Sequence, residues 1–507
     1  MYRITARQPH CLFTAATTRR IEHAAAAALP PHTLMQRAGL AVAQLAQALT
    51  PHARTVWIAC GPGNNGGDGL EAATHLQCSG RQVLVTWLGH PAQAPVDAMA
   101  SWQRAQMSGV QWLDNPPVDF STIDLCIDAL FGIGLSASPT ASNRGPDERL
   151  CACLQALQHS CVPVLAVDLP SGLDADTGQF TPGFASDAPD CHQQAHAPRH
   201  TLSLLSLKPG LFTAAGRDAA GQVWLDDLGV TPAHEPPDAW LSGPHPIPPR
   251  AHASHKGSYG DVAVVGGEGL AERGMGMTGA ALLAASAALH SGAGRVLVAL
   301  LDNGLQPLDT AQPELMFRRF EALDLAWLTV VCGCGGGQAV RRVLTEVIAQ
   351  AARLVLDADA LNALAASAAL QAEITARSRR GQATVLTPHP LEAARLLGCT
   401  TNEVQANRLT AAQHLAEQFQ CVVVLKGSGT VIAAPHHLPS INPTGNARLA
   451  TAGTGDVLAG MVGAHLAAGA CAVRAAREAV YAHGQAANKW PKGQALTASA
   501  LAKALER

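Results

Sequence analysis

The 507-residue sequence predicts an α/β protein of two domains. Both halves alternate short aliphatic, β-branched runs with longer helical patterns, which is typical of mostly parallel sheets covered by helices. Between the halves, residues 231–250 contain seven prolines in twenty positions. Proline has no backbone N–H, so we expect this segment to run extended, without helix or strand hydrogen bonds. We therefore predict one domain in residues 1–230, a linker in 231–250 and a second domain in 251–507.

Composition excludes several classes of protein. Lys and Arg number 35 and Asp and Glu 38, a net charge of −3, so the chain lacks the positive field that nucleic acid or an anionic membrane attracts. The first twenty residues lack the apolar core of a secretory signal. The most apolar stretch, residues 278–301, is interrupted by His290, Gly294 and Arg295, which indicates a buried helix and a strand. We expect a soluble cytoplasmic protein that binds neither nucleic acid nor membrane.

The thirteen cysteines are odd in number and include C-x-C pairs rather than the C-x-x-C pairs of a zinc site, so we interpret them as packed, reduced thiols.

The predicted strands are short apolar runs with turn-forming residues at both ends. A segment rich in Pro, His and Gln, residues 181–199, is interpreted as an insertion, because β-like sequence resumes at 201–207. The first half should contain strands at 55–59, 82–87, 123–128 and 162–168, and the second at 261–265, 295–299, 328–331, 353–357, 383–386 and 421–426.

A glycine-rich loop, G-P-G-N-N-G-G-D-G at 61–69, follows the first long strand. Gly61, Gly63 and Gly66 satisfy G-x-G-x-x-G, and a helix N-terminus after such a loop favours phosphate binding. A dinucleotide-binding dehydrogenase also needs an acidic residue at the end of the second strand. That strand ends in W-L-G-H at 87–90, so an ordinary NAD(H) dehydrogenase is disfavoured.

Aspartates end the next two predicted strands of the first half, at Asp128 and Asp168. Open parallel sheets bind ligands at the carboxyl ends of their strands. We therefore expect residues 64–68, Asp128 and Asp168 to meet in one crevice.

Four ordered motifs now identify a resemblance: N-N-G-G-D-G at 64–69, D-A-L-F-G-I-G-L-S at 128–136, V-D-L-P-S-G-L-D at 167–174 and L-K-P-G-L at 207–211. Together they resemble the NAD(P)H-hydrate epimerase domain, whose fold is a Rossmann-like three-layer α/β/α sandwich. The resemblance implies a K⁺ site at Asn65, Asp128 and Ser171, and oxygen ligands suit that hard ion. It also implies that the hydrated dinucleotide contacts Asn64, Asn65, Gly66, Gly67, Asp68, Gly132, Ile133, Gly134, Leu135, Ser136, Ala137, Ser138 and Asp168.

The chemistry of such a hydrate fits these residue types. Its C6 carries a hydroxyl and the ring nitrogen N1, so its configuration can change by loss and return of the hydroxyl, or by ring opening and closure. Either route needs a proton carrier, and Asp168 is our candidate. Lys208 could be a second carrier or only a charge partner.

The strongest motif of the second half is T-A-G-T-G-D at 451–456, which leads into an apolar helix. Small residues let backbone N–H groups approach a phosphoryl group at the helix N-terminus, and Asp456 can take the proton of an attacking hydroxyl. This looks like the anion hole and base of ribokinase-like enzymes. Upstream, K-G-S-G-T at 426–430 suits a nucleotide, and other sheet ends should supply H-K-G-S-Y-G at 255–260, C-G-C-G-G-G at 332–337, D-A-D-A-L-N at 357–362 and T-P-H-P at 387–390.

This ordered set resembles the ADP/ATP-dependent NAD(P)H-hydrate dehydratase domain, a ribokinase-like fold. Cys334, Leu391 and Ala452 depart from the family pattern. The resemblance implies ADP as phosphoryl donor, Mg²⁺, and homo-oligomers. It implies that Ala280, Gly335, His389 and Asp456 contact the hydrate and that Lys426, Gly427, Ser428, Gly429, Thr430 and Gly455 hold the nucleotide.

We therefore expect a bifunctional repair enzyme for damaged NADH and NADPH, the hydrates NADHX and NADPHX. Its first domain would interconvert the R and S hydrates, with Asp168 catalytic. Its second would phosphorylate the C6 hydroxyl of the S hydrate and eliminate phosphate, with Asp456 catalytic. The alternatives are a ribokinase-like vitamin or sugar kinase fused to a nucleotide-binding domain, and a nucleotide-sensing regulatory protein.

Overall fold

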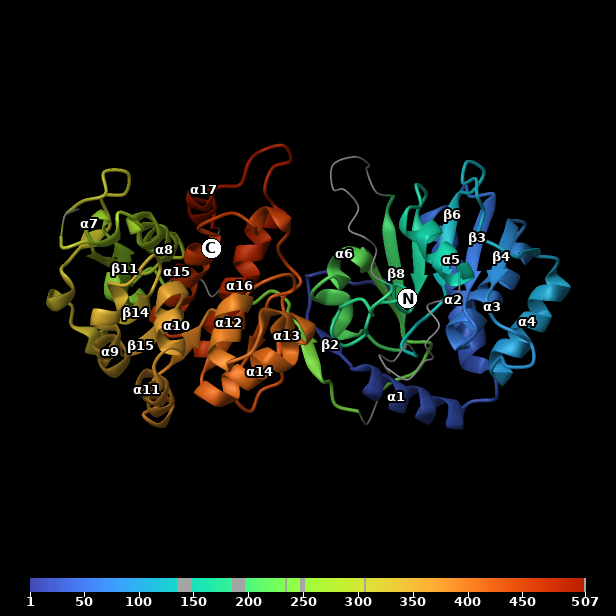
Figure 1. Cartoon of the computed structure of the whole chain (residues 1–507), viewed down its shortest axis with the longest axis horizontal. Coiled ribbons are helices and arrows are strands. Elements are labelled where there is room, and N and C mark those ends of the chain that lie inside the picture. Colours follow the sequence, from blue (N-terminus) through green and yellow to red (C-terminus); the bar gives the residue numbers. More distant parts are fainter. Residues whose placement is uncertain (135–147, 185–196, 233–234, 247–250, 305–306, 506–507) are drawn as a thin grey trace. The chain divides into compact units, whose positions relative to one another are not determined.

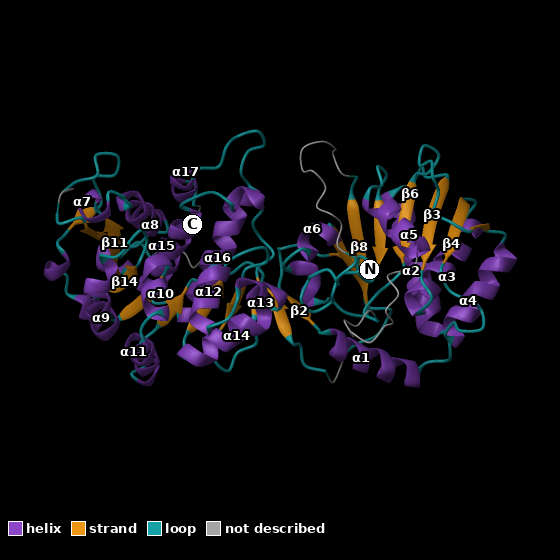
Figure 2. Ribbon diagram, viewed as in Figure 1, coloured by secondary structure: helices purple, strands orange, loops and turns teal. Residues whose placement is uncertain are grey.

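The structure is a computed structural model that describes residues 1–134, 148–184, 197–232, 235–246, 251–304 and 307–505. The chain forms two compact units (Figure 1). The first comprises Met1–Thr5 and Cys11–Ala239, and the second comprises Ala6–His10 and Trp240–Arg507. Each unit contains a mostly parallel sheet and covering helices (Figure 2), so the predicted α/β fold class with two domains is confirmed.

The first unit contains an eight-stranded sheet in the order β1-β9-β8-β7-β6-β3-β4-β5. All neighbouring pairs are parallel except β1 and β9. The strands are β1 Tyr2–Arg3, β3 Thr55–Cys60, β4 Gln82–Trp87, β5 Gln111–Leu113, β6 Leu125–Ala129, β7 Val164–Val167, β8 Arg199–Leu204 and β9 Gln222–Asp226.

Helices cover both faces of this sheet. On β3, Val56 and Ile58 pack into a core with α2 and α3, whereas Trp57 and Ala59 pack on the opposite face with α5. Because β3 is buried on both faces, it reads as a continuous apolar run. The helices are α1 Ala15–Ala28, α2 Thr33–Leu49, α3 Asn64–Cys78, α4 Val96–Ser108, α5 Glu148–Gln158, η1 Pro209–Phe212 and α6 Gly216–Ala220.

The second unit carries a sheet in the order β13-β12-β11-β14-β15-β16-β17-β18-β19-β10-β2. Its central pairs from β13 to β17 are parallel, and β18 is antiparallel to both neighbours. The strands are β2 His10–Leu12, β10 Ala239–Leu241, β11 Asp261–Glu268, β12 Arg295–Leu301, β13 Met316–Phe317, β14 Thr329–Cys332, β15 Arg353–Leu356, β16 Thr384–Leu386, β17 Val422–Leu425, β18 Val431–Ala433 and β19 Ser440–Ile441.

This sheet also lies between two helical layers. Val262 and Val264 of β11 pack with α8, α15, α16 and α17, and Ala263 and Val265 pack on the other face with α9 to α14. The helices are η2 Lys256–Tyr259, α7 Leu270–Arg273, α8 Thr278–His290, η3 Phe320–Ala322, η4 Leu325–Trp327, α9 Val340–Gln350, α10 Ala358–Ala365, α11 Ala368–Arg379, α12 Pro390–Leu397, α13 Thr401–Ala406, α14 Arg408–Phe419, η5 Ala447–Leu449, α15 Thr454–Ala467, α16 Ala472–Asn488 and α17 Ala498–Lys503.

Both sheets reverse their strand order at one point. After β3 the chain adds β4 on one side and later β6 on the other, and after β11 it adds β12 on one side and β14 on the other. Ligands bind at such switch points, outside the carboxyl ends of the strands. The loops after β3 and β6, and those after β11 and β14, are therefore where the sites should lie.

All ten predicted strands form, with ends that shift by up to three residues. The proline-rich segment differs from its prediction, because β10 lies inside it. The N–H groups of Trp240 and Ser242 donate to Pro439 and Ile441 at 2.9 Å each. These residues are not prolines and keep their donors, so the expectation of no strand hydrogen bonds in residues 231–250 was wrong.

Two other expectations concern the whole chain. Every cysteine in the described ranges is a free thiol. Across those same ranges, no helix combines the length and the apolar character needed to cross a membrane.

Candidate functional site

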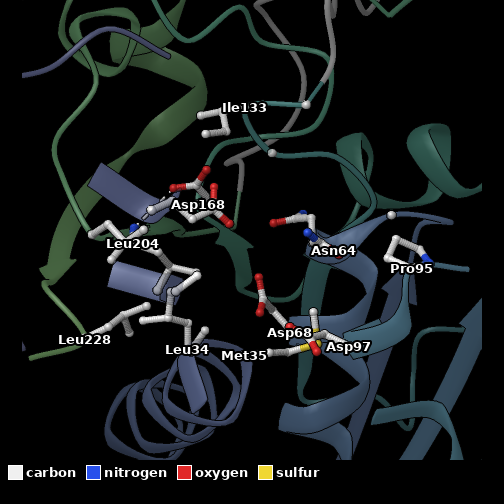
Figure 3. A pocket seen from close by; sticks show the side chains of 18 of the residues that line it. Leu34, Met35, Asn64, Asp68, Pro95, Asp97, Ile133, Asp168, Leu204 and Leu228 are labelled. Atoms are coloured by element: carbon white, nitrogen blue, oxygen red, sulfur yellow. Dashed lines mark hydrogen bonds between the residues drawn. The ribbon is translucent and has the colours of Figure 1, made fainter. Parts of the chain in front are cut away.

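A cavity of about 1000 Å³ lies in the first unit, at the carboxyl ends of β3, β6, β7 and β8 (Figure 3). Its walls come from α1, from the turn before α2 and the start of that helix, from the first turns of α3, and from the loops after β6 and β8. The lining includes the predicted substrate residues Asn64, Asn65, Asp68, Gly132, Ile133, Gly134 and Asp168, together with Lys208. Leu135, Ser136, Ala137 and Ser138 lie outside the described residues.

Three glycines of the loop allow close packing, a role that their spacing did not predict. A Cβ on Gly61 would lie 1.8 Å from the Leu130 carbonyl oxygen, and one on Gly66 would lie 1.9 Å from that of Gly61. A Cβ on Gly67 would lie 2.6 Å from the Met35 side chain. None of these three glycines lines the cavity. Gly66 and Gly67 allow α3 to pack closely, and their predicted contact with substrate stays a prediction.

Asp168 directly follows β7 and has a left-handed backbone, with φ +67°. Such a conformation costs a non-glycine residue roughly 1–3 kcal/mol and is concentrated at functional sites. Its N–H donates to the Leu202 carbonyl at 2.8 Å, and the Leu204 N–H donates to its Oδ1 at 3.2 Å. These bonds hold the carboxylate at the cavity wall.

Lys208 is fully buried and forms an ion pair with Asp168. Its Nζ also donates to the Leu204 carbonyl at 2.7 Å and to Ser203 Oγ at 3.3 Å. An ammonium group has three donors, and each has an acceptor here. The geometry therefore favours the charge-partner alternative for Lys208.

Replacing Lys208 by Met should destabilise the first unit by about 3–5 kcal/mol, because it leaves a buried carboxylate without its cation. Thermal unfolding of the full chain, followed by circular dichroism, measures the shift. Arg54→Met, which removes an exposed cation from the same unit, is the control. An unchanged unfolding transition in Lys208→Met would contradict this role.

Asp128 does not line the cavity, contrary to the expected convergence. Its Oδ1 accepts from Ser171 Oγ at 2.5 Å and its Oδ2 from the Ser171 N–H at 2.9 Å. Burial raises the pKa of Asp128, although the bonds from Ser171 oppose this. No described Lys or Arg forms an ion pair with it. Asp128 and Ser171 are thus brought together behind the wall of the cavity.

Asn65, the third predicted K⁺ ligand, borders the cavity next to Asp168. A Cβ on Gly132 would lie 3.1 Å from both Asn65 Oδ1 and Asp168 Oδ2. The Asn65 Nδ2 is buried, and no described residue accepts a hydrogen bond from it.

Helix α1 forms one wall of this cavity, and the sequence motifs did not predict it. Arg19 donates to the Ile133 carbonyl at 2.7 Å, and Glu22 lines the cavity. Burial, and the nearby carboxylate of Asp168, raise the pKa of Glu22. The helix precedes the first long strand and carries no phosphate-binding or catalytic motif.

The second unit gathers Cys334, Asp357 and Asp456 at the carboxyl ends of β14 and β15, with their ligand atoms within 4.8 Å of one another. Asp456 lies in the first turn of α15, after Gly453, whose φ of +89° makes the tight entry to that helix. Burial, and the nearby carboxylate of Asp357, raise the pKa of Asp456 to about 7.

Lys426 lies beside this cluster. Its Nζ is 2.6 Å from Asp357 Oδ1, which also accepts from Thr387 Oγ1 at 2.8 Å. Burial would lower the pKa of Lys426, but the carboxylates of Asp357 and Glu392 outweigh it and raise the pKa. A Cβ on Gly455 would lie 3.4 Å from Nζ, so this cation is next to the N-terminus of α15.

Arg408, which belongs to none of the motifs, stabilises the predicted nucleotide turn at 426–430. Arg408 is buried and donates to the Leu425 and Lys426 carbonyls at 3.2 and 3.1 Å. Gly427 has φ +136°, and a Cβ there would lie 2.8 Å from the Arg408 guanidinium. Thr430 Oγ1 donates back to the Gly427 carbonyl at 3.1 Å, which closes the turn.

The predicted hydrate residues Ala280 and Gly335 lie together, since a Cβ on Gly335 would be 2.9 Å from that of Ala280. His389 is the N-cap of α12: its Nδ1 accepts from the N–H groups of Leu391 and Glu392 at 3.1 and 3.3 Å. The ring proton is therefore on Nε2, 3.2 Å from Glu392 Oε1. Burial raises the pKa of Glu392 to about 7, and Lys426 opposes the shift.

One motif lies at the wrong end of the sheet for this site. Residues 255–260 precede β11 and so lie at its amino end, where Gly260 packs against Ala467 at the end of α15. Asp456 lies at the other end of that helix.

Comparisons with known proteins cover both units. A family model described as NAD(P)H-hydrate dehydratase matches residues 264–507, and one described as YjeF-related protein N-terminus matches residues 31–210. The bifunctional NAD(P)H-hydrate repair enzyme Nnr of Escherichia coli is 35% identical over 512 residues, which cover 95% of this chain and 90% of that protein. The enzyme of the same name from Coxiella burnetii is 35% identical over 473 residues and covers 90% of each chain.

Among solved structures, the ADP/ATP-dependent NAD(P)H-hydrate dehydratase of Bacillus subtilis co-crystallised with ATP and Mg²⁺ is similar to this chain. It is 32% identical, with a TM-score of 0.43, and the match covers 51% of this chain and 92% of that one.

Proposed function

The chain belongs to the family of bifunctional NAD(P)H-hydrate repair enzymes, and we propose that its two units divide that family's two reactions. It is an enzyme with an epimerase domain and an ADP/ATP-dependent dehydratase domain. The first unit would interconvert R and S hydrates of NADH and NADPH. The second would restore the dihydronicotinamide from the S hydrate. The observation that carries this division is that each unit has its own carboxylate, Asp168 or Asp456, at the carboxyl edge of its own sheet.

In the first unit we assign proton transfer at the C6 hydroxyl to Asp168. The Lys208 ammonium and the Leu204 N–H hold this carboxylate, and both donate to Oδ1. Oδ2 accepts from neither group and borders the cavity beside Gly132. The N-terminus of α3, at Gly63 to Asn65, would bind a phosphate of the dinucleotide, because its backbone N–H groups have no helical acceptors.

K⁺ would be held by Asn65, Asp128 and Ser171. A buried Asp128 carboxylate without an ion-pair partner among the described residues fits a cation, and oxygen ligands suit a hard one. The ion would supply a positive charge that neutralises this carboxylate. Asp128 and Ser171 already hydrogen-bond to each other, so they would position the loop after β6 in either case.

In the second unit Asp456 would take the proton from the C6 hydroxyl as that oxygen attacks the terminal phosphoryl group of ADP. The amides at Gly453 to Gly455 and the Lys426 ammonium would stabilise the charge on the phosphoryl oxygens. The turn at Gly427 to Thr430 would hold the nucleotide. His389 is oriented to donate from Nε2, so it would bind the hydrate as a donor, beside Ala280 and Gly335.

Mg²⁺ would enter this site with the nucleotide phosphates. The cluster of Cys334, Asp357 and Asp456 fits it only in part, because Mg²⁺ prefers oxygen ligands and the burial of the Cys334 thiol raises its pKa. The Asp357 carboxylate, rather than the thiol, would be its protein ligand, so the Asp456 carboxylate stays available to take the proton. The ion would neutralise phosphate charge.

A pH dependence follows from the role of Asp456. A carboxyl with a pKa of about 7 keeps its proton at lower pH, and a protonated base cannot accept another. The dehydration rate at saturating S hydrate and ADP should therefore fall roughly tenfold per unit below about pH 7 and level off above it. Glu392 titrates in the same range, so the Glu392→Gln variant is the control: its dehydration rate should show the same fall below about pH 7. A rate that stays constant down to about pH 5.5 would contradict the assignment.

The overall reaction is tested with purified R hydrate of NADH, ADP and Mg²⁺. Absorbance of the dihydronicotinamide should return, with one phosphate released per hydrate. A stable phosphorylated alcohol without recovered absorbance would instead indicate a vitamin or sugar kinase. Binding without turnover would indicate a nucleotide sensor. The cytoplasmic location and the homo-oligomeric state stay predictions.

A further inference from the structure

Two carboxyl groups enter the epimerase cavity from different walls. Asp168 comes from the loop after β7, and Asp68 comes from the first turns of α3 (Figure 3). Both side chains line the cavity, and the two residues interact electrostatically. The cavity thus offers a carboxyl on each of two walls to a ring that lies between them.

The surroundings of these two carboxyls are opposite in charge. Asp168 has the Lys208 ammonium and the Leu204 N–H as donors. No described residue donates a hydrogen bond to Asp68 or forms an ion pair with it. Burial, and the neighbouring carboxyls of Asp168, Glu22, Glu71 and Asp97, hold the pKa of Asp68 well above its usual range. Two carboxyls whose environments differ in this way can serve as acid and base in one reaction.

Glu22 also lines the cavity, but it stands beside the positive groups. Lys208, His23 and Arg19 all favour its ionised form, whereas no cation acts on Asp68 to a comparable extent. Asp68 is therefore the carboxyl better suited to hold a proton and to give it to a ligand.

If the hydroxyl leaves and returns, rather than the ring opening and closing, inversion at C6 makes a demand that one fixed carboxyl cannot meet alone. Once the hydroxyl has left, C6 is trigonal, and the oxygen must return to the face opposite the one it left. A carboxyl fixed on one wall reaches one face of a bound ring. Either the ring turns over in the cavity, or a second proton carrier serves the other face.

We propose that Asp68 is this second proton carrier, and that the hydroxyl leaves C6 on the side of one aspartate and returns on the side of the other. The proposal deepens, and rests on, the epimerase function proposed for this cavity. In one direction Asp68 gives its proton to the departing oxygen, the C6–O bond breaks with its electrons on oxygen, and the N1 lone pair forms a C6–N1 double bond. Water then attacks the other face of C6, N1 regains its lone pair, and Asp168 takes the proton of that water.

The net result is one inverted carbon and one proton moved from Asp68 to Asp168. Exchange with solvent restores the starting protonation, and the reverse reaction uses the two groups in exchanged roles. No oxidant, reductant or further reactant takes part.

The test uses the full chain in ¹⁸O-labelled water, with R and S hydrates separated before mass spectrometry. Asp68→Asn should lower the inversion rate by roughly 10²–10⁴, the range for a lost acid or base. It should still incorporate ¹⁸O into one epimer without inverting it, because Asp168 can still release and return the hydroxyl on its own face. Asp168→Asn should incorporate ¹⁸O into the opposite epimer. If Asp68 had only a structural role, the two variants would not incorporate ¹⁸O into opposite epimers.

Two controls accompany this measurement. Asp68→Glu should recover part of the inversion rate, and dehydration of the S hydrate by Asp68→Asn should equal that of the wild type. Wild-type inversion in Asp68→Asn, label in the same epimer for both variants, or loss of label from both epimers in Asp68→Asn would overturn the proposal. If the wild-type chain itself does not interconvert the hydrates, the epimerase function fails, which is a separate result.

Discussion

Asp456→Asn is expected to reduce the dehydration rate by roughly 10²–10⁴, the range for the loss of a general base. Asparagine keeps the size and the hydrogen-bonding edge of the side chain but cannot take the proton of the C6 hydroxyl. The amides at Gly453 to Gly455 and the Lys426 ammonium remain, so nucleotide affinity should stay within a few-fold of the wild type. Rates with purified S hydrate, together with ADP affinity from calorimetry, separate turnover from binding.

The first unit is the control for this variant, because it should continue to equilibrate R and S hydrates without consuming ADP. Dihydronicotinamide formed by Asp456→Asn at nearly the wild-type rate would contradict the phosphorylation mechanism. A loss of ADP affinity equal to the loss of rate would show instead that Asp456 acts in binding.

Asp168→Asn is expected to reduce epimerisation by roughly 10²–10⁴ while dehydration of the S hydrate stays unchanged. The amide can still accept from the Leu204 N–H, but the buried Lys208 ammonium loses its carboxylate, so the thermal unfolding of this variant is measured beside its activity. Interconversion of separated R and S hydrates, followed by chromatography, measures the loss. Conversion of R to S at nearly the wild-type rate would mean that Asp168 only binds or positions the dinucleotide.

Most of the longer strands could be predicted because they are apolar runs that are largely buried. Most strands of two or three residues could not, although β16 was predicted, and the five-residue β9 was also missed. Strands such as β5, β18 and β19 have two or three residues, too few to display a period, and depend on partners elsewhere in the chain. β10 was hidden among prolines, since its pairing with β19 uses only Ala239 to Ser242.

The site residues that sequence motifs supplied are those that end strands or begin helices, such as Asp168 and Asp456. The supporting residues lie far from them in sequence and carry no motif. Arg408 reaches the predicted nucleotide turn from α14, and Glu22 reaches the cavity of the first unit from α1. Asp128 was placed on the cavity because it ends a strand, but Ser171 holds it behind the wall.

The roles of the glycines were the hardest to predict from the sequence. Gly61 and Gly66 match a phosphate-binding pattern by spacing, yet each, like Gly67, permits a close backbone or helix contact. A glycine in a motif indicates only that a side chain would not fit at that position. Whether a ligand or a neighbouring segment fills that space depends on the packing of α3 against the loop after β6 and against α2 and α4.

The most direct measurement gives purified R hydrate and ADP to Asp168→Asn, to Asp456→Asn and to their equimolar mixture. If the two units carry separate reactions, neither variant alone should restore dihydronicotinamide at more than about a hundredth of the wild-type rate. The mixture should restore it, because Asp456→Asn supplies S hydrate in solution and Asp168→Asn dehydrates it. Full recovery by either variant alone, or no recovery by the mixture, would contradict the division of the repair reaction between Asp168 and Asp456.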